Sequence, residues 1–323
     1  MVSRRLMIGL GMGTGALLAG GAATALSFDT AIARAHAAIS PSLSTIISTR
    51  HGDMEYADIG TGPAVLMIHG TGGGFDQGLL FARPLVAAGY RIIAPSRFGY
   101  LRSSFPDEPS SANQADALVD LLDHLDIDRI AISGGSAGAL SAIEFAVRHP
   151  HRTAALLPIV PVTYVPGRQL SQTQPPEIEA AMALLQSDFL FWMALNIVPD
   201  LMIGNLLATD PALLKTVSAT EAARAREILW SILPVSQRAE GLINDARLAG
   251  NPARSGLETI AAPTLAISVE DDRFNTAAAA RHIAATVPSA RSIIYPTGGH
   301  IWLGHDADLF GAIESFLTEI GYR

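Results

Sequence analysis

Short apolar runs that alternate with helix-periodic segments are the feature that most limits how this chain folds. The runs cover residues 64–68, 90–94, 130–133, 154–160, 264–269 and 292–295. Most are apolar without a regular polar alternation, which predicts strands that are covered on both faces of a sheet. Helical spacing of apolar residues predicts helices over residues 113–125, 277–286 and 308–320. The order predicts an α/β fold with a mostly parallel central sheet and helices on both faces.

The alternation stops between residues 161 and 254, where helical segments occur without a convincing strand. A helical block inside such a series predicts an insertion that covers one edge of the sheet. We therefore expect a core formed by residues 41–160 and 255–323, and an α-helical cap, or lid, formed by residues 161–254. The cap is rich in apolar residues and has no cluster of basic ones, which favours an apolar cleft beside the core.

The first 40 residues differ in composition from the rest of the chain. Arg4 and Arg5 precede an uncharged, Gly- and Ala-rich run over residues 6–26, and Ala35-His36-Ala37 has the small-x-small pattern of a cleavage site. This order predicts a signal peptide, and the paired arginines resemble a twin-arginine export signal. A membrane anchor is the alternative, because about 20 residues suffice to span a bilayer. We expect an exported protein, periplasmic or extracellular, or one anchored through residues 6–26, and residues 1–40 are left out of the fold prediction.

Composition excludes several other kinds of site. The 323 residues carry a formal net charge of −8, which argues against a nucleic-acid partner. The absence of cysteine excludes disulfides, a thiolate nucleophile and cysteine-ligated metals. His149 and His151 have no partners at ligand spacing, so we expect no metal. The Gly-rich loop at residues 69–74 is not followed by a phosphate-binding lysine, so we expect no nucleotide and no other cofactor.

A serine between glycines follows the apolar run at residues 130–133. The pentapeptide GGSAG (residues 134–138) matches Gly-x-Ser-x-Gly, and apolar residues at helical spacing come after it. Glycines at both ends indicate a turn too crowded for side chains. Between a strand and a helix, the motif presents Ser136 on a sharp bend at the carboxyl end of the strand, where α/β sheets bind ligands. The alternative is an ordinary Gly-rich turn in which Ser136 caps the helix.

With this motif the chain resembles the serine-nucleophile branch of the α/β-hydrolase superfamily, the carboxylesterase- and lipase-like members with a helical cap. The resemblance extends from about residue 45 to the C-terminus. It implies a catalytic triad in the chain order serine, acid, histidine. His300, after the last apolar run, is then the base, with His305 as competitor. Asp272, in the sequence Glu-Asp-Asp-Arg after residues 264–269, is the acid, with Asp271 as the alternative.

Backbone N–H donors are also needed, because the tetrahedral intermediate of acyl transfer carries a negative oxygen. The resemblance implies that one donor of this oxyanion hole is the N–H of Ala137, directly after the nucleophile. The other should come from the loop at residues 69–74, where Thr71 is the first choice and Gly72 the near alternative. His69, at the start of this loop, is expected to be structural, with its ring bonded to nearby backbone.

A serine nucleophile predicts chemistry at a carbonyl group. With the apolar cap, the hypothesis is a hydrolase that cleaves carboxylic esters of medium-sized apolar acyl or aryl substrates through an acyl-enzyme. The alternatives are a C–C bond hydrolase of ring-fission-type diketones, which the short sequence at residues 271–274 resembles, an acyltransferase, and a non-catalytic binder of apolar ligands. The expected partner is a small-molecule ester, and the N-terminal segment allows membrane association. The sequence carries no signal of oligomeric state.

Overall fold

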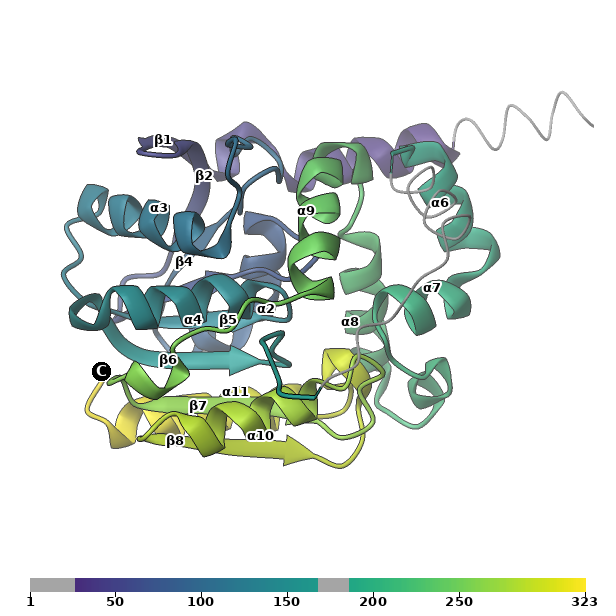
Figure 1. Ribbon diagram of the computed structural model, residues 1–323. Helices are drawn as coiled ribbons and strands as arrows, with labels where there is room; N and C mark the ends of the chain where they lie inside the picture. The colour runs from purple at the N-terminus through teal and green to yellow at the C-terminus, as the bar shows by residue number, and fades with distance from the viewer. Residues whose placement is uncertain (1–26, 168–185) are drawn as a thin grey trace, which may run out of the picture.

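An eight-stranded sheet forms the centre of the computed structural model, which describes residues 27–167 and 186–323 (Figure 1). The strand order is β1-β2-β4-β3-β5-β6-β7-β8. Six strands run parallel, and their bounds are β3 (Ala64–Ile68), β4 (Arg91–Pro95), β5 (Ile130–Gly135), β6 (Thr153–Ile159), β7 (Thr264–Val269) and β8 (Ala290–Tyr295). The hairpin of β1 (Thr45–Thr49) and β2 (Gly52–Ile59) joins antiparallel to β4. The predicted α/β fold class is therefore confirmed.

Helices cover both faces of this sheet. One face packs against α3 (Ser111–His124), α4 (Gly138–Arg148) and α10 (Thr276–Thr286), in a core that includes Leu118, Ile143 and Ile283. The other face packs against α2 (Phe75–Ala87) and α11 (Asp306–Glu319). Because β5 and β6 are buried along their whole length, their continuous apolar sequences follow directly from cover on both faces.

In the described residues between β6 and β7, four α-helices form a separate layer at the carboxyl ends of the parallel strands. They are α6 (Asp188–Ile197), α7 (Pro199–Leu206), α8 (Ala219–Trp230) and α9 (Ala239–Gly250). Figure 1 shows the arrowheads of β6 and β8 pointing toward α7 and α8. This cap has its own hydrophobic cluster, to which Phe191, Ile203 and Leu229 belong. Helical insertion after β6 thus agrees with the sequence prediction, while residues 168–185 of the predicted cap lie outside the described residues.

A helix over residues 27–38 precedes the sheet and packs against the cap. Phe28 contacts Phe189 and Trp192 edge-on, with ring centroids 5.3 and 5.6 Å apart. Leaving all of residues 1–40 out of the fold was therefore wrong for residues 27–39, because apolar side chains of this helix complete the cap cluster and Ile39 is buried in the core. Of the signal peptide or anchor predicted within residues 1–40, residues 1–26, which include the uncharged run over residues 6–26, lie outside the described residues.

No single helix among residues 27–167 and 186–323 has the length and hydropathy needed to cross a membrane. The pair α6 and α7 meets both criteria only when the two helices are taken together, and they meet at an angle of 110°. Trp192 of α6 and Met202 of α7 are buried in the cap cluster, whereas Ile197 and Leu201 of the same pair are 65% and 58% exposed. Packing within the molecule therefore covers only one part of the apolar surface of this pair.

Candidate active site

Ser136 stands on a sharp bend between β5 and α4. Its backbone is left-handed, with φ of 51°, a conformation that a residue other than glycine adopts only at some cost. Side chains at the two flanking glycines would collide with backbone: a Cβ on Gly134 would lie 2.6 Å from the carbonyl oxygen of Gly138, and one on Gly138 would lie 2.7 Å from that of Ile68. The bend therefore requires glycine at both positions, for the reason inferred from the sequence.

Hydrogen bonds to the neighbouring strand hold this bend in place. The N–H of Ser136 donates to the carbonyl oxygen of Ile159 at 2.9 Å, and its own carbonyl accepts from the N–H of Val162 at 3.1 Å. Both partners lie at the end of β6 or directly after it. A strained backbone that several bonds restrain is pre-organised, and such strain concentrates at functional sites.

Asp272 and His300 come together at the ends of β7 and β8. Nδ1 of His300 lies 2.8 Å from Oδ2 of Asp272, and both side chains are almost fully buried. His300 sits in a short 3₁₀ helix (Gly299–Ile301) after β8, and Asp272 lies in the turn after β7. A hydrogen bond from Nδ1–H to a carboxylate fixes the tautomer in which Nε2 is the ring nitrogen that accepts a proton.

The carboxylate of Asp272 has further donors. Oδ1 accepts the N–H of Phe274 at 2.9 Å, and Oδ2 accepts the hydroxyl of Thr276. Burial alone would raise the pKa of Asp272, but His300, Thr276 and the Phe274 N–H together outweigh burial and hold this pKa below its ordinary value. Asp272 is therefore an ionised group under the ring of His300 at neutral pH.

The two residues kept open as alternatives have other contacts. Asp271 accepts the backbone N–H of Gly299 at 2.8 Å, so it fixes the loop that carries His300 and does not contact the ring. His305 stacks on Tyr295, with centroids 4.3 Å apart, and its Nδ1 lies 3.6 Å from Asp308. Of the candidate acids and bases, the structure thus brings together Asp272 and His300.

Ser136 and His300 face one cavity of about 330 Å³ beneath the cap. Thr71 of the loop after β3 lines the same cavity. No hydrogen bond joins the Ser136 hydroxyl to the His300 ring in the described part of the chain. Since Nδ1 of that ring is engaged by Asp272, Nε2 is the nitrogen available to a group in the cavity. Among the described residues, the site therefore gathers a hydroxyl, an imidazole and a carboxylate contributed by the ends of β5, β8 and β7.

The backbone N–H groups expected to bind an oxyanion differ in their hydrogen bonds. The N–H of Gly72 donates to the hydroxyl of Tyr100 at 3.3 Å. In the described residues, the N–H groups of Thr71 and Ala137 have no protein acceptor, whereas the N–H of Gly70 donates to Gln77 at 3.0 Å. An N–H without an acceptor beside a cavity is free to bind a ligand oxygen. This pattern favours Thr71 over Gly72.

His69 is structural, as expected from the sequence. Its Nδ1 donates to the carbonyl of Gly70 at 2.7 Å, and its Nε2 accepts the N–H of Arg97 at 3.0 Å. Burial, followed by the charge of Arg97, lowers the pKa of His69 well below its ordinary value, so the ring is neutral. This neutral ring ties the loop after β3 to the loop after β4.

A buried ion pair under the cavity was not predicted. Arg97 binds Asp245 of α9 through two hydrogen bonds of 2.5 and 2.6 Å, and Tyr100 donates its hydroxyl to the same carboxylate at 2.5 Å. Arg97 also donates to the carbonyls of His69 and Gly70, at 3.1 Å each. The pair thus connects the cap to the loop that carries Thr71. Its members are 148 positions apart in the sequence, so no local pattern signals it.

Charge in the catalytic cavity is sparse. Asp245 and His300 are the titratable side chains that line it, and both are engaged by protein partners. No arginine or lysine lines the cavity in the described residues, and its remaining walls are mostly apolar, as at Phe81, Val160 and Phe274. The same part of the chain contains no group of three His, Cys, Asp or Glu side chains placed to hold a metal ion.

Fold and site together define the class of protein. A family model described as alpha/beta hydrolase fold matches residues 63–304, and the chain belongs to this family. The predicted membership of the α/β-hydrolase superfamily is thereby confirmed.

Relatives with curated descriptions are hydrolases. A 2-hydroxy-6-oxononadienedioate/2-hydroxy-6-oxononatrienedioate hydrolase of Paraburkholderia xenovorans (strain LB400) is 32% identical over 274 residues, which cover 80% of this chain and 89% of that protein. A 2-hydroxy-6-oxo-6-phenylhexa-2,4-dienoate hydrolase of Burkholderia cepacia is 28% identical over 261 residues, covering 79% and 87%. Among solved structures, an alpha/beta hydrolase fold protein from Nakamurella multipartita matches with a TM-score of 0.67 and 24% identity, covering 86% of this chain and 99% of that one. The protein is therefore a hydrolase, as predicted.

Proposed function

We propose that hydrolysis proceeds through a triad of Ser136, His300 and Asp272, with the N–H groups of Ala137 and Thr71 as the oxyanion hole. The observation that carries this proposal is the 2.8 Å hydrogen bond between Asp272 and His300, beside a cavity that a strained serine also faces. The alternative of a helix-capping serine does not explain this pair, because a cap needs neither a base nor an acid.

The proposed chemistry follows from these positions. Nε2 of His300 takes the hydroxyl proton while Oγ of Ser136 bonds to the substrate carbonyl carbon. The carbonyl oxygen becomes negative and is held by the two N–H groups. When the tetrahedral intermediate collapses, the imidazolium gives its proton to the leaving group, and Asp272 stabilises the cation until then. Water then repeats the sequence on the acyl-enzyme and releases the acid.

For the substrate we propose a ketone in a ring-fission-type diketone, so that the bond broken is C–C. This was the alternative prediction from sequence, and the two curated relatives named above support it over the ester. A carbon leaving group must accommodate an electron pair, which is feasible where that carbon is conjugated to a second carbonyl. The protonated His300 would deliver the proton to this carbon, as it would to an alkoxide.

Ester hydrolysis is the second candidate, and a specific observation favours it. The dienoates in the relatives' names carry a carboxylate, while the cavity beside Ser136 has no lining arginine or lysine in the described residues. Burying an anion without a partner is costly. Neutral esters with apolar groups do not incur this cost.

One comparison separates the two candidates. The full-length chain is assayed with 2-hydroxy-6-oxo-6-phenylhexa-2,4-dienoate, by loss of its absorbance, and with p-nitrophenyl esters of increasing chain length. We expect kcat/KM for the dienoate to exceed that of the best ester at least tenfold; the reverse ranking would select the esterase. Ser136→Ala should abolish turnover of both at an unchanged thermal midpoint, while Ser315→Ala on α11 should leave both rates unchanged.

The proposed triad is tested independently of substrate by a fluorophosphonate probe. Labelling of the wild-type chain but not of Ser136→Ala is expected, because only an activated serine reacts. An unlabelled, folded wild-type chain would refute the triad and point to a binding protein. Acyl transfer is tested by adding an alcohol to the ester assay: we expect the free acid as the product, and a new ester in its place would make the chain a transferase.

A further inference from the structure

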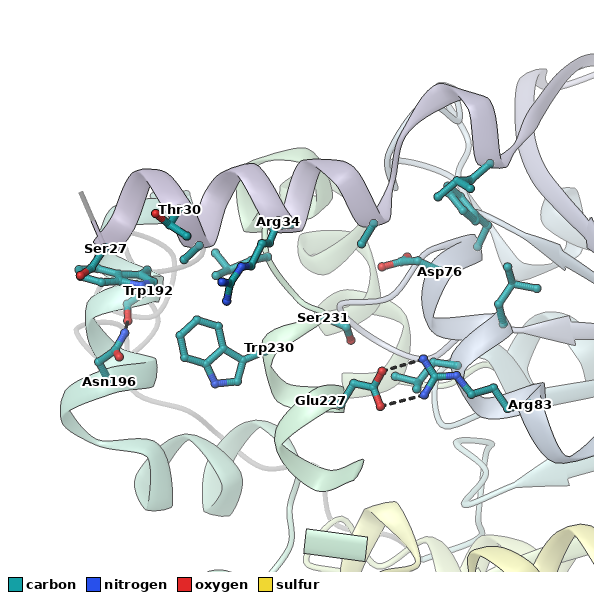
Figure 2. A pocket seen from close by; sticks show the side chains of 18 of the residues that line it. Ser27, Thr30, Arg34, Asp76, Arg83, Trp192, Asn196, Glu227, Trp230 and Ser231 are labelled. Atoms are coloured by element: carbon teal, nitrogen blue, oxygen red, sulfur yellow. Dashed lines mark hydrogen bonds and ion pairs between the residues drawn. The ribbon is translucent and has the colours of Figure 1, made fainter. Parts of the chain in front are cut away.

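A second, larger cavity of about 1010 Å³ lies between the helix of residues 27–38, α2, α6 and α8 (Figure 2). It shares no lining residue with the catalytic cavity. On α2, Leu80 lines the second cavity and Phe81 lines the catalytic cavity. On α8, Trp230 lines the second cavity and Ile228 lines the catalytic cavity. The two cavities are therefore separated by the thickness of these helices, and the second is not an extension of the site around Ser136.

The walls of this second cavity are mainly apolar. Leu79 and Phe75 of α2, Trp192 of α6 and Trp230 of α8 contribute large side chains, and alanines of the helix over residues 27–38 also line the cavity. Trp192 is almost fully buried, whereas 36% of Trp230 is exposed. A cavity at the upper end of the size range of small-molecule sites, with such walls, fits a long apolar group.

Four charged side chains line the second cavity, and three of them are paired. Arg83 of α2 binds Glu227 of α8 at 2.7 and 2.8 Å, as the dashed lines in Figure 2 mark. Asp76 binds Arg238, which lies outside the lining, at 2.8 Å. Arg34 makes no ion pair or hydrogen bond with the described part of the chain. These pairs leave one uncompensated positive charge in the lining.

Arg34 is placed to receive the charged end of a ligand. Its side chain extends from the helix over residues 27–38 toward Trp230 and between the groups that line the cavity (Figure 2). The residue is exposed, so its guanidinium lies at the solvent side, or mouth, of the cavity, whereas Phe75 and Trp192 of the lining are almost fully buried. A guanidinium in this position can bind a carboxylate through two parallel hydrogen bonds.

We infer that this cavity binds a long-chain carboxylate, with the carboxylate on Arg34 and the hydrocarbon chain against Trp192 and Trp230. The assignment rests on the combination of one unpaired cation at the mouth with an apolar interior. It is independent of the proposed catalytic function, because no residue of the triad or oxyanion hole lines the cavity.

Two of the three tryptophans of the chain line this cavity, which gives a direct assay. Brominated myristate, a quencher of indole fluorescence, is titrated into the full-length protein. Saturable quenching is expected. In a Trp192→Phe/Trp230→Phe variant the remaining Trp302, buried against Phe81 with centroids 5.3 Å apart, should not be quenched. This variant therefore distinguishes the second cavity from the catalytic one, whose wall includes Phe81.

The role of the charge is tested with Arg34→Gln, which should weaken myristate binding at least tenfold and leave binding of the uncharged alcohol of the same length unchanged. Arg226→Gln on α8 is the matched control, because Arg226 is exposed, contacts the carbonyl of Ala222 and lies outside the cavity. Thermal melts establish that each variant is folded. Absence of saturable quenching, quenching that persists in the double Phe variant, or equal affinity in Arg34→Gln would each overturn the inference.

Discussion

Replacing Asp272 with asparagine tests the proposed triad most sharply, because the change is isosteric. The carboxylate accepts three hydrogen bonds: Oδ2 from the His300 ring and from Thr276, and Oδ1 from the N–H of Phe274. An amide has one acceptor oxygen and one NH2 donor, so it cannot reproduce this set. If its oxygen stays on Phe274, the NH2 group faces Nδ1 of His300. The imidazole must then carry its proton on Nε2 and cannot act as a base toward Ser136.

The opposite orientation of the amide is also unfavourable. Its oxygen would accept from His300, but the NH2 group would face the N–H of Phe274 and leave a buried donor unsatisfied, at a cost of about 1–3 kcal/mol. The tautomer that prevents catalysis is therefore preferred. In serine triads such a trap lowers kcat by about 10⁴-fold, which corresponds to about 5.4 kcal/mol of activation free energy.

The assay compares kcat of Asp272→Asn with that of Asp271→Asn, using whichever substrate the wild-type chain turns over best. Asp271 accepts one backbone N–H, from Gly299, and asparagine can still accept it, so we expect less than a tenfold loss in this control. A loss of at least 10²-fold is expected for Asp272→Asn. Activity within tenfold of wild type in Asp272→Asn, or an equal loss in both variants, would refute the role assigned to Asp272.

Three further predictions concern stability. Gly138→Ala should lower the free energy of unfolding by about 1–3 kcal/mol, because the new Cβ meets backbone carbonyls at the end of β3; Gly311→Ala on α11, where nothing lies within 4 Å, should be neutral or stabilising in the same urea titration. Arg97→Met should lower the free energy of unfolding in urea by about 3–5 kcal/mol, because it leaves the carboxylate of Asp245 buried without its ion-pair partner. The double variant Arg97→Met/Asp245→Leu should recover most of this loss. The pKa of Asp272 is lower in the folded state than in the unfolded state, so the unfolded state takes up a proton first as the pH falls. The contribution of this carboxylate to stability is therefore lost below about pH 4. Between pH 5 and pH 3, urea titrations should show a smaller decrease in the free energy of unfolding for Asp272→Asn than for wild type.

The sequence predicted the parallel strands well because burial on both faces produces continuous apolar runs. The predicted strands at residues 64–68 and 264–269 coincide with β3 and β7. The hairpin β1–β2 was not predicted, since it lies at the sheet edge and has charged residues along β2. Helix α2 was also missed, because Gly78 and Pro84 within it weaken the helical signal.

Some parts of the site are encoded by residues that are neighbours in the sequence, and others form between residues that are far apart in it. The bend at Ser136 is encoded by five consecutive residues, and the pairing of Asp272 with His300 was predicted because the family resemblance implies an acid and a histidine after the last two strands. The ion pair of Arg97 and Asp245 depends on how α9 folds back over the core, which no short motif encodes. The helix over residues 27–38 was misjudged for a different reason: it is Ala-rich like the run before it and ends in the small-x-small pattern at Ala35-His36-Ala37, so it was assigned to the same N-terminal segment although Asp29 and Arg34 end the uncharged run.

That helix gives N-terminal processing a structural consequence. Phe28 covers the rings of Phe189 and Trp192, and Ala31 and Ala35 pack on the same cluster. A protease that cut after Ala37 would remove this cover, so the buried ring of Trp192 would become accessible and Phe189, already 41% exposed, would be uncovered further. The same cut would remove Arg34 and one wall of the second cavity. The shortened form would therefore expose more aromatic surface and lose the proposed carboxylate site.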